Sequence, residues 1–262
     1  MIAVLSPAKS LDFTTPPSTE LYSTGDFLDQ ADLLVERARQ LKPKQLSKLM
    51  SISDKLAELN HERFAEYEAP LEPSAQTKQA ALAFTGDTYV GFDAPSMSDD
   101  DLAFAQQHVR ILSGLYGLLR PMDLIRPYRL EMGSSLKNSR GKNLYAFWGD
   151  RLGEALGEAL EESGSRVVVK CASNEYFSAV EGKIPDARVI TPVFKDRKNG
   201  AYKIISFYAK QARGAMAAHM VRNRITSPDE LKTFDWGGYA WSEDMSDGDE
   251  WVFVREAPTP KS

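Results

Sequence analysis

Four short apolar runs, spread over almost the whole length of the chain, place the strongest constraint on its fold. They are IAVL at 2–5, RVVVKC at 166–171, VITPVF at 189–194 and EWVFV at 250–254. Each has the length and composition of a strand, and helical patterns fill the sequence between them. Because strands from both ends and the middle must share one core, the sequence predicts an α+β fold with a mixed β-sheet surrounded by helices.

The sequence contains no internal repeat and no polar stretch long enough to connect two domains. With 262 residues, 42% of them hydrophobic, the chain can bury a sizeable core. We therefore expect a single domain over residues 1–262.

Helical patterns are clearest in the first half of the chain. Residues 26–41 place their apolar side chains on one face, and Pro43 is suited to the first turn of a second helix. Two serines are candidate N-caps: Ser74 for a helix over 77–84 and Ser98 for a helix over 99–119.

The second half contains a strong hairpin signal. Asn199 and Gly200 lie between two apolar runs, and both residue types accept the positive φ angles of a tight hairpin turn. The pattern predicts a β-hairpin here, followed by a helix over 209–224.

Several classes of protein are excluded by composition. The apolar run after Met1 stops at Ser6, too early for the core of a signal peptide, and no run approaches the length of a membrane span. We expect a soluble, cytoplasmic protein without a membrane partner. The single cysteine, Cys171, agrees with a reducing compartment and excludes an internal disulfide.

Metal-binding motifs are absent from the sequence. His61, His108 and His219 are dispersed, and none has a second ligand at motif spacing. We expect no metal site and no cofactor.

The net charge is −5, but the basic residues concentrate in the middle of the chain. Residues 188–224 contain nine basic residues and one acidic residue, and residues 101–150 contain seven and four. An acidic protein with this distribution can still present a locally positive surface. The alternative is a lysine-rich hairpin and helix that are simply solvated.

Residues 46–60, LSKLMSISDKLAELN, join two amphipathic half-patterns through a four-residue break. A helix-hairpin-helix element has this arrangement, and the N–H groups that open its second helix contact a DNA phosphate. Ser51 and Ser53 stand where such elements usually have glycine, and Ser53 can cap the second helix. Asp54 would repel a phosphate at the same N–H groups. An ordinary αα-hairpin is the alternative interpretation.

Two further segments carry cations in a pattern suited to nucleic acid. Arg120, Arg126 and Arg129 lie among prolines and tyrosines, a composition that suits a phosphate backbone or a stacked base, and also the packing of a long loop. Lys210 and Arg213 are three residues apart and share one face of the expected helix.

Seven stretches, in order and across nearly the whole chain, carry a family resemblance. They are SPAKSLDF, MSISDKLAELN, FTGDTYVGF, ILSGLYGLLRPMDLIRPYRLEMG, LYAFWGD, ASNEYF and KIISFYAKQARG. Together they resemble the YaaA family of peroxide stress resistance proteins. The segment VVVKCASNEYF departs from the family pattern at Lys170 and Cys171, so no family role is carried onto Cys171.

The resemblance implies a cytosolic bacterial protein of the response to hydroperoxide, which limits unincorporated iron and oxidative damage. It also implies the single-domain fold of that family, with a positively charged cleft and a helix-hairpin-helix element at about 43–66. The expected partner is double-stranded DNA, bent or damaged DNA included, bound by a monomer. The residues expected to contact DNA are nine in the matching stretches, Lys9, Ser51, Ser53, Lys55, Arg120, Arg126, Arg129, Lys210 and Arg213, together with Lys48 shortly before the second stretch.

An enzyme acting on a nucleotide or phosphorylated small molecule is the alternative function. The candidate acid–base residues near the arginines are Asp87, Asp123, Glu131, Asp150 and Glu175. Ser6 and Lys9, directly after the first strand, can face a ligand at a strand end. Because no nucleotide-binding or hydrolase motif occurs, the catalytic residues stay unassigned. For Cys171, a buried inert thiol is favoured over a nucleophile or a peroxide sensor.

Overall fold

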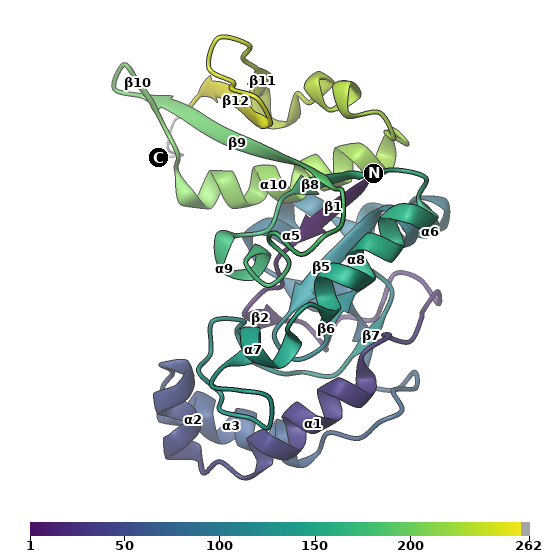
Figure 1. Cartoon of the computed structure of the whole chain (residues 1–262), viewed down its shortest axis with the longest axis vertical. Coiled ribbons are helices and arrows are strands. Elements are labelled where there is room, and N and C mark those ends of the chain that lie inside the picture. The colour runs from purple at the N-terminus through teal and green to yellow at the C-terminus, as the bar shows by residue number, and fades with distance from the viewer. Residues whose placement is uncertain (258–262) are drawn as a thin grey trace.

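The computed structural model describes residues 1–257 of the chain (Figure 1). The domain predicted over 1–262 therefore includes five residues, 258–262, that lie outside the described part.

One eight-stranded sheet organises residues 1–257, in the order β11-β12-β9-β8-β1-β5-β6 with β10 added beside β9. Neighbours run parallel from β5 through β1, β8 and β9 to β12, whereas β6, β10 and β11 are antiparallel to their partners. This confirms the predicted mixed sheet and α+β class. The strands are β1 Ile2–Leu5, β5 Val109–Ser113, β6 Gly117–Leu119, β8 Val167–Lys170, β9 Arg188–Lys198, β10 Ala201–Lys203, β11 Ala240–Trp241 and β12 Glu250–Glu256.

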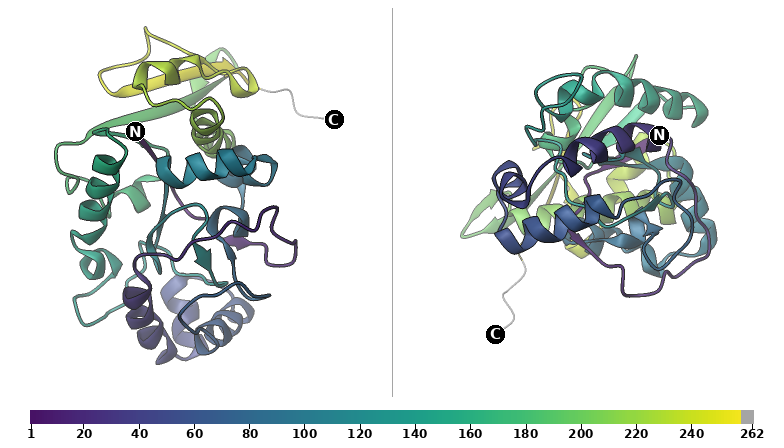
Figure 2. Two further views of the ribbon diagram at one scale, coloured as in Figure 1. Left: turned by 90° about the vertical axis from the view of Figure 1, so that its right-hand side faces the viewer. Right: turned by 90° about the horizontal axis from the view of Figure 1, so that it is seen from below.

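Helices cover this sheet and extend the molecule at one end (Figures 1 and 2). The helices α1, α2 and α3 lie together at that end, and β9 to β12 with α10 form the other. The α-helices are α1 Leu28–Arg39, α2 Pro43–Met50, α3 Asp54–Ala65, α4 Ala80–Ala83, α5 Asp87–Phe92, α6 Asp99–His108, α7 Leu144–Trp148, α8 Arg151–Glu162, α9 Asn174–Phe177 and α10 Ser206–Arg222.

Short elements complete the described chain. The 3₁₀ helices are η1 Ala94–Ser96, η2 Pro228–Thr233 and η3 Trp236–Gly238. Two small antiparallel pairs join β2 (Ser10–Leu11) to β4 (Phe84–Thr85), and β3 (Lys78–Gln79) to β7 (Leu124–Ile125).

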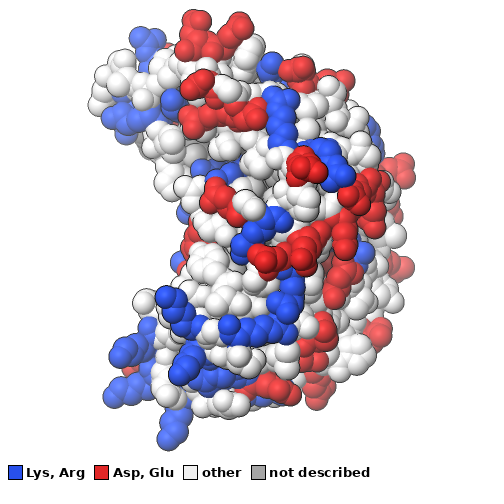
Figure 3. All heavy atoms as spheres, viewed as in Figure 1, with Lys and Arg blue, Asp and Glu red and all other residues white. Residues whose placement is uncertain are grey.

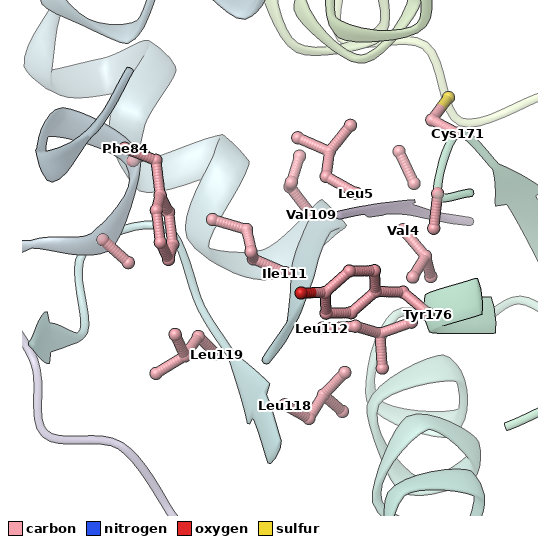
Figure 4. Packing of buried hydrophobic residues seen from close by; sticks show 14 of the residues in the cluster. Val4, Leu5, Phe84, Val109, Ile111, Leu112, Leu118, Leu119, Cys171 and Tyr176 are labelled. Atoms are coloured by element: carbon pink, nitrogen blue, oxygen red, sulfur yellow. The ribbon is translucent and has the colours of Figure 1, made fainter. Parts of the chain in front are cut away.

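The core is built around β1 and β5. All four residues of β1 and all five of β5 are buried, as expected for parallel strands covered on both faces. Figure 4 shows Val4, Leu5, Ile111 and Leu112 packing among side chains from both faces, with the Tyr176 ring beside Leu112. Because β1 runs parallel to both β5 and β8, the carboxyl ends of these three strands lie at one edge of the sheet.

Helices α5 and α10 are in backbone contact, which requires glycine in both. A Cβ atom at Gly214 would lie 1.7 Å from the Thr88 carbonyl oxygen, and one at Gly91 would lie 1.9 Å from the Gln211 carbonyl oxygen. The small residues of the α10 segment thus allow the close approach of a neighbouring helix.

Local patterns predicted several elements correctly. The first strand, α1 and α2 lie where expected, and Ser98 caps α6 by accepting a hydrogen bond from the Asp101 N–H at 3.1 Å. The predicted hairpin is also present, with φ of 55° at Asn199 and 79° at Gly200. Helix α10 begins at Ser206, three residues before the predicted start.

One predicted helix is wrong, and another is too long. The segment 77–84 forms only the single turn α4, because residues 78–79 are extended and pair with β7. Ser74 accordingly takes part in a turn with Thr77, whose Oγ1 accepts from the Ser74 N–H at 2.9 Å. The predicted helix over 99–119 ends at His108, and the apolar residues beyond it form β5 and β6. Burial between neighbouring strands overrode the helical spacing in both cases.

Candidate nucleic-acid interface

The elbow, residues 50–53 between α2 and α3, is a tight turn with a left-handed residue at its start. Ser51 has φ 51° and ψ 51°, so serine here adopts a conformation that glycine would adopt more readily. The Ser47 hydroxyl donates to the Ile52 carbonyl at 2.7 Å and closes the turn from the α2 side. The geometry is that of an αα-hairpin, and its assignment as a helix-hairpin-helix DNA contact stays a prediction.

The start of α3 faces solvent. Ser53 is the N-cap, and its Oγ accepts from the Leu56 N–H at a long 3.4 Å. Asp54 and Lys55 in the first turn are both exposed. The first N–H groups of a helix lack intrahelical partners and carry a partial positive charge, so this turn can accept an anion.

A basic groove lies beside the elbow, between α1, α2 and the loop after residue 133. Its volume is about 580 Å³, and its lining residues are Arg37, Leu41, Gln45, Lys48, Leu49, Ser135, Leu136 and Lys137. Lys48 was predicted as a DNA contact, whereas Arg37 and Lys137 were not. Arg37 Nε donates to the Lys137 carbonyl at 2.8 Å, which joins residues 100 positions apart in the sequence.

Figure 3 shows that this face of the molecule is hollowed between the α1–α3 end and the β9–β10 end. Lys and Arg side chains gather on the wall formed by the α1–α3 end, while Asp and Glu dominate the opposite, convex side. We refer to the hollowed side as the concave face.

At the carboxyl end of β1, Lys9 and Arg129 share one carboxylate. Lys9 Nζ lies 2.8 Å from Glu131 Oε2, and Arg129 Nη2 lies 3.2 Å from Glu131 Oε1. The Lys9 side chain is 63% exposed, so it can change partner readily. The Arg129 Nε atom is buried without a hydrogen-bond partner in the described residues. The structure thus brings these two predicted contacts together around one acid.

Arg120 and Arg126 are largely engaged in holding loops. Arg120 pairs with Asp26 and Asp123, both at 3.1 Å, and donates to the Thr24 carbonyl at 2.6 Å. Arg126 Nη1 donates to the Glu66 carbonyl at 2.6 Å. Only part of each guanidinium therefore remains for a ligand.

The two predicted contacts on α10 have different surroundings. Lys210 is exposed, whereas Arg213 is half-buried and lines a small pocket with residues of β8 and β9. The cations of α10 therefore lie towards one end of the concave face, and those at the elbow lie at the other end (Figure 1).

The candidate acid–base residues do not form one cluster. Asp123 is fully buried beneath Arg120, and burial raises the pKa of its carboxyl. Asp150 is 75% exposed and lies 3.9 Å from Lys183. Glu175 accepts from the Gly133 N–H at 3.0 Å and so fixes the loop that carries Glu131. Ser6 also has a structural role, because its Oγ accepts from the Ser173 N–H at 2.9 Å.

Cys171 is buried at the end of β8, and burial raises the pKa of its thiol to about 12. A thiol with such a pKa is a poor nucleophile at neutral pH. Within residues 1–257, no group of three or more His, Cys, Asp and Glu side chains is arranged to hold a metal ion. Nor does any helix of that range have the length and apolar character needed to cross a membrane.

The fold and this surface define an α+β protein with a mixed sheet and cations on a concave face. Residues 1–245 match the protein family described as peroxide stress protein YaaA. The chain is also 57% identical, over 259 residues, to a UPF0246 protein of Burkholderia thailandensis, a match that covers 98% of this chain and 99% of the relative. UPF0246 proteins of Burkholderia mallei and Burkholderia pseudomallei are 56% identical over the same shares of both chains. The chain therefore belongs to the YaaA family of peroxide stress proteins.

Proposed function

We propose that this peroxide stress protein binds duplex DNA without strong sequence specificity, as a cytoplasmic monomer, and thereby helps limit oxidative damage and unincorporated iron. The first turn of α3 would receive one backbone phosphate, and cations of the concave face would receive others. Contacts of this kind fix position on the duplex but carry no sequence information.

The observation that carries the proposal is the coincidence of the elbow with the basic groove. Lys48 and Lys55 are exposed on either side of the elbow, and neither forms an ion pair within residues 1–257. Arg37 and Lys137 extend the positive surface across the groove. The exposed start of α3 offers N–H donors, and the two lysines beside it form no ion pair within residues 1–257. Such a surface matches a phosphate backbone in charge and in hydrogen-bond donors.

Asp54 opposes this binding, because its carboxylate competes with a phosphate for the first-turn N–H groups. Its contribution is limited, since an exposed charge near a helix end is worth about 0.3–1 kcal/mol. The flanking lysines can offset a term of that size.

The test is fluorescence anisotropy of labelled duplexes of two unrelated sequences and of one gapped form. The wild-type protein is compared with the double variant Lys48→Glu, Lys55→Glu. We expect similar affinity for both intact sequences and a loss of at least tenfold in the double variant, because two attractive contacts become repulsive.

The matched control is Arg166→Glu. Arg166 is a half-exposed cation that immediately precedes β8, at the edge of the sheet opposite the carboxyl ends. Charge reversal there should leave affinity within about twofold. A control loss about half as large as that of the double variant on a logarithmic scale, in proportion to its one charge reversal, would assign the binding to net charge alone. Unchanged affinity in a folded double variant would remove the elbow from the interface.

A further inference from the structure

A small pocket lies between the carboxyl end of β8, the strand β9 and the N-terminal half of α10. Its volume is about 50 Å³, and Lys170, Asn174, Thr191, Phe194, Ile204 and Arg213 are among its lining residues. Figure 1 places α9 and the start of α10 side by side on the concave face, away from the elbow.

Two cationic residues, Lys170 and Arg213, line this pocket. The Lys170 side chain is only 14% exposed, and its ammonium lies 4.6 Å from the centre of the Phe177 ring. Its one carboxylate partner, Glu181, is 3.6 Å away and 60% exposed. Arg213 forms no ion pair and no hydrogen bond with any residue of the described range 1–257. Glu181 is thus the only acid paired with either cation in that range.

The apolar wall of the pocket strengthens the electrostatic interactions of these two cations. Phe194 is 1% exposed and Ala209 is 3% exposed, so one side of the pocket is apolar. Charges beside such a wall interact more strongly than charges in water. Two like charges held there repel each other, and an anion between them would convert this repulsion into attraction.

Two of the other lining residues suit an oxyanion. The Asn174 amide and the Thr191 hydroxyl are hydrogen-bond donors for oxygen acceptors. A cavity needs about 10–15 Å³ of such volume to hold one water molecule, so this pocket has room for roughly three to five heavy atoms. A tetrahedral anion such as phosphate is of that size.

We propose that this pocket is a binding site for a phosphate group, held by Lys170 and Arg213. The proposal goes beyond duplex binding at the elbow, because its residues come from β8, β9, α9 and α10 and it holds whether or not the elbow contacts DNA. The phosphate can belong to a free phosphomonoester or to the end of a nucleic acid strand, and the experiment separates these sources.

The first arm measures thermal stability and heats of binding with inorganic phosphate and with adenosine monophosphate, at constant ionic strength. Saturation of a site in the folded state raises the melting temperature. We expect both ligands to stabilise the wild-type protein. The variants Arg213→Gln and Lys170→Gln should each weaken binding roughly ten- to hundredfold, because each removes a charged hydrogen-bond donor.

The control variant is Lys198→Gln, which removes an exposed cation from the end of β9, beside the hairpin turn and outside the pocket. Its affinity for phosphate should equal that of the wild-type protein. Two pocket variants are used so that misfolding of one, visible by circular dichroism, does not decide the result.

The second arm compares a short single-stranded oligonucleotide with and without a 5′-phosphate. Tighter binding of the phosphorylated strand that depends on Arg213, without any response to the two small ligands, would assign the site to nucleic acid ends. The opposite pattern would assign it to a small phosphorylated metabolite. The proposal is overturned if no phosphate-bearing ligand binds in a way that depends on Arg213 or Lys170.

Discussion

Replacement of Gly214 by alanine tests whether the contact between α5 and α10 holds this fold together. The new Cβ atom would lie 1.7 Å from the Thr88 carbonyl oxygen and 2.8 Å from the Phe92 nitrogen, where ordinary contacts begin at 3.4 Å. Both obstacles are backbone atoms, so no side-chain rotation relieves them, and the two helices must move apart. Gly91 closes the same contact from the other helix, because a Cβ atom there would lie 1.9 Å from the Gln211 carbonyl oxygen.

The magnitude follows from two opposed terms. Overpacking of a well-filled core costs about 1–3 kcal/mol, with rigid obstacles at the upper end. Alanine is about 1 kcal/mol better than glycine inside a helix, which offsets part of that cost. We expect a net loss of about 2 kcal/mol, or roughly 4–8 °C in melting temperature for a chain of this size.

The assay is thermal unfolding followed by circular dichroism, with Gly157→Ala as the matched control. Gly157 is also inside a helix, α8, but a Cβ there would meet only the Pro185 ring, with Cδ at 3.1 Å and Cγ at 3.8 Å. The control should change stability by no more than about 1 kcal/mol. An unchanged or raised melting temperature in Gly214→Ala would refute the close contact, because helix propensity alone predicts a gain.

Four further predictions concern single residues. Cys171 should react slowly with a thiol reagent in the native protein and fully after denaturation, because its thiol is buried and its pKa is raised; rapid native labelling would contradict the burial. Asp196→Ala should lower stability by about 3–5 kcal/mol in chemical denaturation, since it leaves the buried Arg255 unpaired. Burial lowers the pKa of His108, so the folded protein binds a proton there less readily than the unfolded chain does. The contribution of the neutral imidazole to stability is therefore present above pH 6.5 and is lost as the pH falls below that value. In thermal melts from pH 8 to 5, the stability of the His108→Gln variant should depend less on pH than that of the wild-type protein. Asp54→Asn should tighten duplex binding by about two- to fivefold in anisotropy titrations, and weaker binding would exclude phosphate from the first turn of α3.

Local sequence signals were sufficient to predict the elements whose structure depends only on residues near one another in the chain. Pro43 opens α2, Ser98 caps α6, and Asn199 with Gly200 forms the hairpin turn. They failed at 109–119, because the same apolar spacing fits a helical face or a buried strand. Pairing of β5 with β1 decides between the two, and that pairing joins segments more than 100 residues apart.

The same limit applies to the candidate sites. The elbow lies within fifteen consecutive residues and could be predicted as a turn between helices. The groove beside it could not, because Arg37 and Lys137 meet only in the folded chain. Arg120 was predicted as a DNA contact from its neighbours in sequence, yet Asp26 and Asp123 take much of its guanidinium. Lys170 and Arg213 likewise line one pocket only through the packing of α10 against the sheet.

The most direct test of the account is the salt dependence of duplex binding. Each phosphate neutralised by a cation contributes about −0.9 to the slope of log affinity against log salt concentration. With Lys48, Lys55 and the groove cations Arg37 and Lys137 in contact, the wild-type slope between about 50 and 200 mM salt should reach about −3 to −4. The Lys48→Glu, Lys55→Glu variant should have a slope shallower by about 2. Absence of binding at about 50 mM salt, or equal slopes for the two proteins, would contradict DNA contact at the elbow.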